Sequence, residues 1–148
     1  MDTPYDLPLG DGDGGYAFRM MPDDDFDEGA SSVSVDAVAN GRAVLVTYTW
    51  THAEDGAQRG TLMLGIPAED GAVSAAWVDS WHQRDVVQLR GTGSPTGATV
   101  GYEYAPGWTW EIEVSVDDGA LALVMRNGVP ESDDSPAVRY DVMRNHWS

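Results

Sequence analysis

Apolar and polar residues alternate with a period of two along most of the chain after Ala30. The segment 108–117 shows this plainly, because its even positions carry Trp, Ile and Val and its odd positions carry Thr, Glu, Ser and Asp. Side chains of a β-strand point alternately to its two faces, so the period predicts strands with one buried face. Similar runs are RAVLVTYTWTH, RGTLMLGI, AVSAAWVDSWH, VVQLRG, ATVGYEYA, ALALVMRN and AVRYDVMRNHW. No run has the period of an amphipathic helix.

Turn-forming dipeptides separate these runs at Asn40-Gly41, Asp70-Gly71 and Asp118-Gly119, and Asp55-Gly56 precedes another. Asn-Gly and Asp-Gly tolerate positive φ, and between alternating runs they indicate hairpins. Consecutive hairpins predict an antiparallel meander of about ten strands. Closing such a sheet removes its edges and leaves room for one small ligand. We therefore expect an all-β, up-and-down barrel, with a two-sheet sandwich as the alternative.

The length of 148 residues suits one domain with a core of its own. Residues 1–15 are rich in Pro, Gly and Asp and are expected to be irregular, so the barrel domain is assigned to 16–148. The acidic run 23–28 resembles the start of a calcium loop. Glu28 stands where that loop needs glycine, and Ser34 stands where it needs glutamate, so we expect a solvated acidic loop.

The charge balance is strongly acidic, with 8 basic residues, all arginine, against 25 acidic ones, for a net charge of -17. Such a field repels phosphate backbones and anionic lipid surfaces, so neither nucleic acid nor membrane is an expected partner. The first ten residues lack the features of a secretory signal, which predicts a cytoplasmic location. Without cysteine there is no disulfide or thiolate metal site. A homodimer remains open as an assembly state.

The run AAWVDSWH is unusual for a strand that only packs a core. Alternation places Trp77, Asp79 and Trp81 on one face, with His82 on the other. A buried carboxylate is costly unless it is paired or hydrogen-bonded, and Arg126 or Arg144 is the expected partner. Inward aromatic residues with a few polar groups are typical of a small-molecule pocket. The candidate ligand-binding residues are Trp50, Trp77, Asp79, Trp81, Tyr104, Trp108, Trp110, Arg126 and Arg144. The alternative is structural, because aromatic side chains also close barrel ends.

The runs TYTW, GTLMLG, AWVDSWH, YAPGWTWEIEV, LALVMRN and AVRYDVMR together resemble the bacterial domain-of-unknown-function family 1579. The resemblance covers most of the chain after Ala30. It implies a calycin-like β-barrel akin to lipocalins and fatty-acid-binding proteins, and it implies no activity. The chain departs from the family near its start, where GYAFRMM replaces the usual Gly-x-Trp opening.

Three functions fit these features. The first is a barrel that binds a small apolar or aromatic ligand without a cofactor, oriented by Asp79, an arginine and indole N–H groups. The second is a haem-binding barrel that uses His82 or His146, although the three histidines show no metal-ligand spacing. The third is a cofactor-free enzyme with Asp79 as acid or base. No G-x-S-x-G motif indicates a nucleophilic serine.

Overall fold

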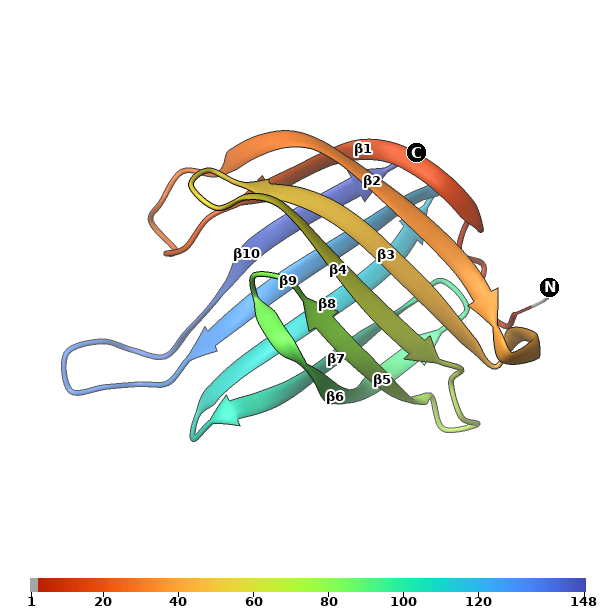
Figure 1. Cartoon of the computed structure of the whole chain (residues 1–148). Helices are drawn as coiled ribbons and strands as arrows, with labels where there is room; N and C mark the ends of the chain where they lie inside the picture. Colours follow the sequence, from red (N-terminus) through yellow and green to blue (C-terminus); the bar gives the residue numbers. More distant parts are fainter. Residues whose placement is uncertain (1–2) are drawn as a thin grey trace.

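The computed structural model describes residues 3–148 and shows a closed barrel of ten antiparallel strands (Figure 1). The strands are β1 (Gly10–Phe18), β2 (Asp27–Val38), β3 (Ala43–His52), β4 (Gly56–Gly65), β5 (Ala72–Asp79), β6 (Gln83–Ser94), β7 (Gly97–Ala105), β8 (Trp108–Asp117), β9 (Ala120–Val129) and β10 (Val138–Trp147), with a short 3-10 turn η1 (Ala39–Gly41). Each strand pairs with its neighbours in sequence, and β1 pairs with β10 to close the barrel. The up-and-down barrel is confirmed, and the sandwich is wrong. Among residues 3–148, no helix has the length and apolarity to cross a bilayer.

The hairpin turns lie where the dipeptides predicted them. Asn40 and Gly41 have φ of 56° and 83° between β2 and β3. Asp118 and Gly119 have φ of 50° and 79° between β8 and β9. Gly71, with φ of 84°, lies in the connection from β4 to β5. The expected turns are confirmed, and positive φ explains the need for Asn, Asp and Gly there.

The glycine-rich start of the chain is a strand rather than an irregular segment from residue 10 onward. β1 begins at Gly10, so the expected irregular stretch 1–15 is wrong for 10–15, while residues 1 and 2 lie outside the described part. A side chain at Gly14 would collide with the carbonyl oxygen of His146 on β10. The glycines thus permit the close approach of β1 and β10 that closes the barrel.

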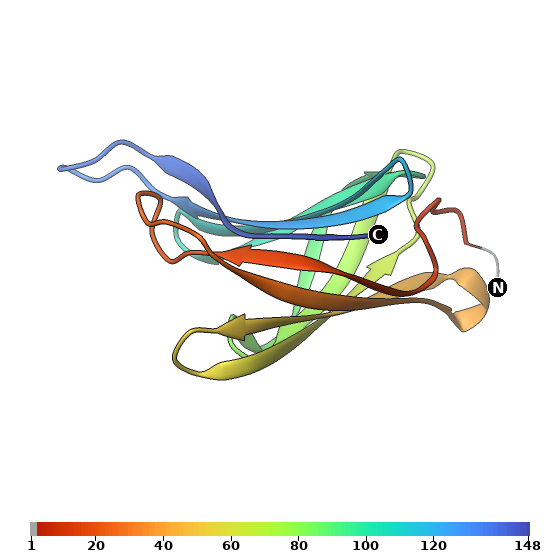
Figure 2. The same ribbon diagram turned by 90° about the horizontal axis from the view of Figure 1, so that it is seen from above.

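The segment before β1 covers one end of the barrel. Tyr5 and Leu7 are buried, with exposures of 3% and 5%. The Tyr5 hydroxyl donates to the carbonyl of Gly65 at 2.7 Å, and the Asp6 N–H donates to the carbonyl of Pro95 at 2.7 Å. In Figure 2 this segment folds over the end near the termini, while the β9–β10 connection projects at the opposite end. The barrel therefore has one covered end and one end formed by five hairpin connections.

Inward residues of every strand fill the barrel, as the alternation predicted for β3, where Val44, Val46, Tyr48 and Trp50 are at most 1% exposed. In β10 the alternation is interrupted. The register against β9 shifts between Asp141 and Met143, so Met143 and Asn145 are buried, and Arg144 faces outward. A bulge moves all following side chains to the other face. The expectation that Arg144 points inward is wrong for this reason.

Candidate functional site

The carboxylate of Asp79, the last residue of β5, is fully buried inside the barrel. Its Oδ2 accepts hydrogen bonds from the Tyr48 hydroxyl at 2.6 Å and from Trp50 Nε1 at 3.3 Å. Its Oδ1 accepts from the backbone N–H groups of Trp81 at 2.9 Å and His82 at 2.8 Å. Four neutral donors therefore hold this buried carboxylate, and no basic side chain among residues 3–148 forms an ion pair with it.

Neither arginine expected beside Asp79 lies there. Arg126 pairs across the strands with Glu111, on the outer wall. Its guanidinium binds Glu111, Glu113 and Asp141, each at 2.9 Å. Arg144 binds Asp141 at 2.8 Å on the same outer wall. The prediction of an Asp79–arginine pair is wrong, and so is the assignment of Arg126 and Arg144 to the interior.

Tyr48 connects the carboxylate to a second indole. Its hydroxyl accepts a hydrogen bond from Trp77 Nε1 at 3.0 Å while donating to Asp79. Burial, and then the neighbouring Asp79 charge, raise the pKa of Tyr48 well above its usual value, so the hydroxyl stays protonated. Gly60 of β4 lies between β3 and β5, where a side chain would collide with the Tyr48 hydroxyl. Glycine at this position makes the Tyr48–Asp79 bond possible.

The strand that contains Asp79 ends earlier than the alternation predicted. Residues 80–82 form a turn, and the Asp79 side chain binds two N–H groups of that turn. Trp81 is partly buried, stacks on His52 with ring centroids 4.6 Å apart, and donates from Nε1 to Asp55 at 2.8 Å. His82, which alternation placed on the face opposite Trp81, instead points into the aromatic interior.

His82 is the centre of the aromatic cluster inside the barrel. Its ring stacks on Trp50, with centroids 4.9 Å apart and planes at 20°. Four further rings lie within 6.4 Å of it, namely Trp81, Trp110, Phe18 and Trp77. Burial lowers the pKa of His82 to about 4, with Asp79 acting in the opposite direction, so the imidazole is neutral at physiological pH.

Beside this cluster is a pocket of about 310 Å³, at the hairpin end of the barrel, which is the left-hand end in Figure 1. It is lined by Met20, Trp77, Trp81, His82, Gln83, Tyr102, Tyr104, Trp110, Asn127, Tyr140 and Val142. Trp77 and Trp110 stack with centroids 5.7 Å apart and planes at 12°. We call this cavity the aromatic pocket.

Two ring nitrogens of the aromatic pocket are buried without a hydrogen-bond partner in the described chain. They are Nε2 of His82 and Nε1 of Trp110. The side-chain amide of Asn145 is also buried and unpartnered, but Asn145 does not line this pocket. Buried polar groups in proteins are nearly always bonded, so these ring nitrogens and the Asn145 amide are exceptions among the described residues.

The rim of the aromatic pocket consists of Gln83, Tyr102, Tyr104 and Asn127. The Tyr102 hydroxyl donates to the Gln83 side chain at 2.8 Å, and the Tyr104 hydroxyl donates to the Asn127 side chain at 2.6 Å. Burial raises the pKa of both tyrosines, so both stay protonated. None of the lining residues is arginine, aspartate or glutamate.

Of the nine residues predicted from sequence, four line the aromatic pocket, namely Trp77, Trp81, Tyr104 and Trp110. Trp50 and Asp79 are buried behind it. Trp108, predicted to face inward, is 38% exposed at the start of β8 and packs against Tyr104 outside the lining. Trp108 is the first residue of β8, and the pairing of β7 with β8 shifts register beside it, between Glu103 and Ala105.

Sequence reasoning missed the polar members of the lining, Gln83 and Asn127, together with Tyr102 and Tyr140. The alternation put Tyr102 on the same face as Tyr104, and this signal could have placed it at the site. Gln83 and Asn127 gave no such signal, because a single amide in a strand is ordinarily solvated.

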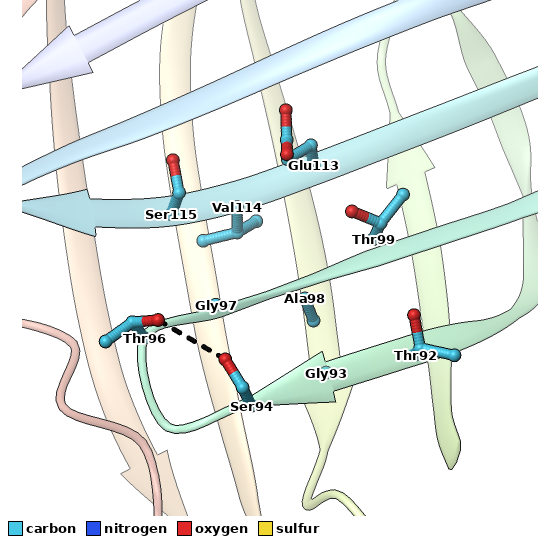
Figure 3. Close-up of a pocket in the computed structure, with 10 residues that line it drawn as sticks. All are labelled: Thr92, Gly93, Ser94, Thr96, Gly97, Ala98, Thr99, Glu113, Val114 and Ser115. Atoms are coloured by element: carbon cyan, nitrogen blue, oxygen red, sulfur yellow. Dashed lines mark hydrogen bonds between the residues drawn. The ribbon is translucent and has the colours of Figure 1, made fainter. Parts of the chain in front are cut away.

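A second hollow, of about 360 Å³, lies over the β6–β7 hairpin toward the covered end of the barrel (Figure 3). Small and hydroxyl-bearing residues line it, and the Ser94 and Thr96 hydroxyls lie 3.3 Å apart. Its one charged residue, Glu113, is already bound to Arg126. None of its lining residues is aromatic or carries an unpartnered buried polar side-chain atom. The aromatic pocket is therefore the better candidate site.

Within residues 3–148, no three His, Asp, Glu or Cys side chains converge as metal ligands. No protein-family model matches the chain, and no curated protein is significantly similar to it. What the structure shows is a closed antiparallel barrel of ten strands with aromatic side chains inside, and no family model supports the resemblance to family 1579.

Proposed function

We propose that the protein binds a small, flat, apolar or aromatic molecule in the aromatic pocket. Indole and phenol rings form most of the lining, which suits stacking against a planar ligand. A volume of about 310 Å³ is near the lower limit for ligand pockets and favours a molecule of about one or two fused rings. The proposal includes a calycin-like assignment for the barrel, as the sequence resemblance implies.

The observation that carries this proposal is the aromatic lining of the pocket, in which Trp77 and Trp110 stack with planes at 12°. Aromatic pairs contribute about 0.5–1.5 kcal/mol beyond the area that they bury, so a planar ligand gains from contact with such rings. Behind the pocket, Tyr48 donates to Asp79 and accepts from the Trp77 indole, which holds Trp77 in place.

The enzymatic alternative loses support from the position of Asp79. Both of its oxygens accept hydrogen bonds from the protein, and it does not line the aromatic pocket. A general base must reach the proton that it removes. Asp79 therefore acts as a structural anchor of the site.

The haem alternative has one observation in its favour, the buried and unpartnered Nε2 of His82, since haem iron is commonly held by a histidine. However, the rings of Trp50 and Trp110 lie within 5.3 Å of the imidazole, and the pocket volume suits a ligand much smaller than a tetrapyrrole. Absorbance of the freshly purified protein near the Soret region tests this alternative directly.

Calorimetric titration with quinoline, a neutral bicyclic probe, tests the proposed function. We expect saturable binding that Trp110→Ala weakens by about tenfold or more, because that variant removes a wall of the pocket. Trp108→Ala is the matched control on the same strand, since Trp108 lies outside the lining. Equal affinity in the two variants, or no binding by the unmodified protein, would contradict the proposal. Native mass spectrometry of freshly purified protein would reveal a co-purified ligand.

A further inference from the structure

We propose that two copies of the chain associate through the outer surface of β3, β4, β5 and β6, as a weak symmetric dimer. These four neighbouring strands run from yellow to green in Figure 1, and we call their outer surface the β3–β6 wall. The hollow on this wall shares no residue with the aromatic pocket, so an interface here does not depend on the proposed function. Three features of the wall point to a second copy: its charge, its shape and its size.

The β3–β6 wall is nearly free of acid, although the chain has 25 acidic residues. The only two in these four strands are Asp79, which is buried inside the barrel, and Asp85, near the start of β6. By contrast, β8 alone contains Glu111, Glu113 and Asp117. The acidic residues are therefore concentrated on other parts of the surface.

This distribution of charge favours a partner that is itself acidic. A cationic partner would be attracted to the surfaces that carry the carboxylates, and not to the β3–β6 wall. A second copy has a net charge of -17, so it approaches most closely where carboxylates do not face carboxylates. The β3–β6 wall is the surface that meets this condition.

The shape of the wall is self-complementary. Val86 of β6 is 71% exposed and Met63 of β4 is 42% exposed, which is unusual for apolar side chains. They lie on the two strands that flank β5, and both border a hollow of about 420 Å³. Small residues, among them Gly65, Ser74 and Ala76, also line the hollow. A two-fold axis brings the same patch of both copies together, so Val86 of each copy can enter the hollow of the other.

The periphery of the wall carries the polar groups that surround an interface core. Arg59, Arg84 and Arg90 are exposed, and none of them forms an ion pair within residues 3–148. An apolar centre with a polar, solvent-accessible rim is the usual anatomy of an interface. These arginines are available to carboxylates of the second copy.

The size of the wall predicts a weak dimer. The four strands are 8 to 12 residues long. At about 4.8 Å between strands and about 3.3 Å per residue, the wall covers about 600 Å² on each copy, or about 1,200 Å² in total. This area is at the lower limit for specific interfaces, so we expect a dissociation constant in the micromolar range or weaker.

Sedimentation equilibrium of the full chain tests for the dimer. Protein concentrations run from about 1 μM to about 500 μM, at about 0.05 M and about 0.5 M sodium chloride. We expect a reversible monomer–dimer equilibrium that tightens several-fold at the higher salt, because salt screens the repulsion between two copies of charge -17. A monomer at every concentration and both salts would overturn the proposal.

Three variants locate the interface. Val86→Glu places a carboxylate at the centre of the wall and should weaken the dimer by about tenfold or more. Val86→Ser removes the apolar side chain without adding charge and should weaken it by about fivefold. Val138→Glu is the matched control, because Val138 is 40% exposed on β10 and the change in net charge is the same. It should alter the dissociation constant by less than about twofold.

Thermal melts check that the variants fold, and the exposure of Val86 and Val138 predicts that they do. Equal weakening by Val86→Glu and Val138→Glu would reduce the effect to net charge and overturn the proposal. A dimer that forms equally well with Val86→Glu would place the interface on another surface and overturn it as well.

Discussion

Two charged groups of the barrel wall are stabilised in opposite ways. Asp79, inside, is fully buried and held by four neutral donors. Arg126, outside, is about one fifth exposed and held by the carboxylates of Glu111, Glu113 and Asp141. Among the described residues, only uncharged hydrogen-bond donors bind Asp79. Arg126, in contrast, is bound by three carboxylates and is also in contact with water.

The difference indicates which charged groups contribute most to the stability of this fold. Water and salt screen the outer network, so its pairs contribute little to stability. Partial burial acts to raise the pKa of Asp141, but the hydrogen bond from Arg144 and the charge of Arg126 keep it below its usual value. At Asp79 no solvent replaces a lost partner, so each removed donor leaves a buried group unsatisfied. The inner cluster should therefore dominate the effect of mutations on stability.

The largest expected effect is that of Asp79→Ala. It strands the hydroxyl of Tyr48, the indole N–H of Trp50 and two backbone N–H groups, and should lower the free energy of unfolding by about 4 kcal/mol. Chemical denaturation measures the change. Asp117→Ala, at an exposed position, is the control and should cost less than about 0.5 kcal/mol. Similar stabilities for the two variants would show that the inner cluster is not dominant.

A second charge can be forced into the interior with acid. The folded pKa of His82 is about 4, below its usual 6.5, so the unfolded chain binds this proton first as the pH falls. The contribution of neutral His82 is fully present above pH 6.5 and is lost as the pH falls toward 4, at a cost of about 3 kcal/mol. Relative to His82→Phe, the unmodified protein should lose about 3 kcal/mol of unfolding free energy as the pH falls through this range, so the two curves of stability against pH converge or cross. Parallel pH profiles would rule the effect out.

Tyr48→Phe tests how much one hydroxyl of the buried cluster contributes to stability, because it keeps the ring and removes only the hydroxyl. The change takes a donor from Asp79 and an acceptor from the Trp77 indole, so we expect a loss of about 2 kcal/mol. Tyr102→Phe, which removes a hydroxyl from the partly exposed rim, should cost under about 1 kcal/mol. Thermal melts of both variants give the order, and a reversed order would contradict the argument.

The smallest effect belongs to the outer network. Arg126→Met removes the shared partner of Glu111, Glu113 and Asp141, and should cost about 1 kcal/mol at low salt. The difference from the unmodified protein should shrink at about 1 M sodium chloride, where screening is nearly complete. A loss as large as that of Asp79→Ala would mean that the outer charges, too, are shielded from water.

The sequence predicted the barrel and its inner face wherever the alternation ran without interruption, as in β3 and most of β8. It also placed Trp77 and Asp79 inside correctly. It went wrong at the turn after Asp79 and at the bulge after Asp141, because a shift of one residue reverses every following face. Neither interruption has a glycine or proline to reveal it.

The sequence did not predict the partners of Asp79, for another reason. Alternation assigns faces but not register, and register is what sets Tyr48 opposite Gly60 and Gly60 opposite Asp79 on three successive strands. Gly60 was the available signal, since glycine within a strand often marks the close approach of another group. Because Asp79 carries a charge, an arginine was the expected partner. In the structure, a tyrosine hydroxyl, a tryptophan indole and two backbone N–H groups bind the carboxylate instead.

The stacked indoles of Trp77 and Trp110 also give the protein an optical property. Their planes are nearly parallel and their centroids lie 5.7 Å apart, close enough for the electronic transitions of the two chromophores to couple. Such coupling splits the shared absorption band and produces paired circular dichroism signals of opposite sign. The two rings come from β5 and β8, so the signal depends on the spacing of strands that are not neighbours in the sheet. The barrel thus contains a built-in exciton pair that reports, without any label, on the shape of the pocket.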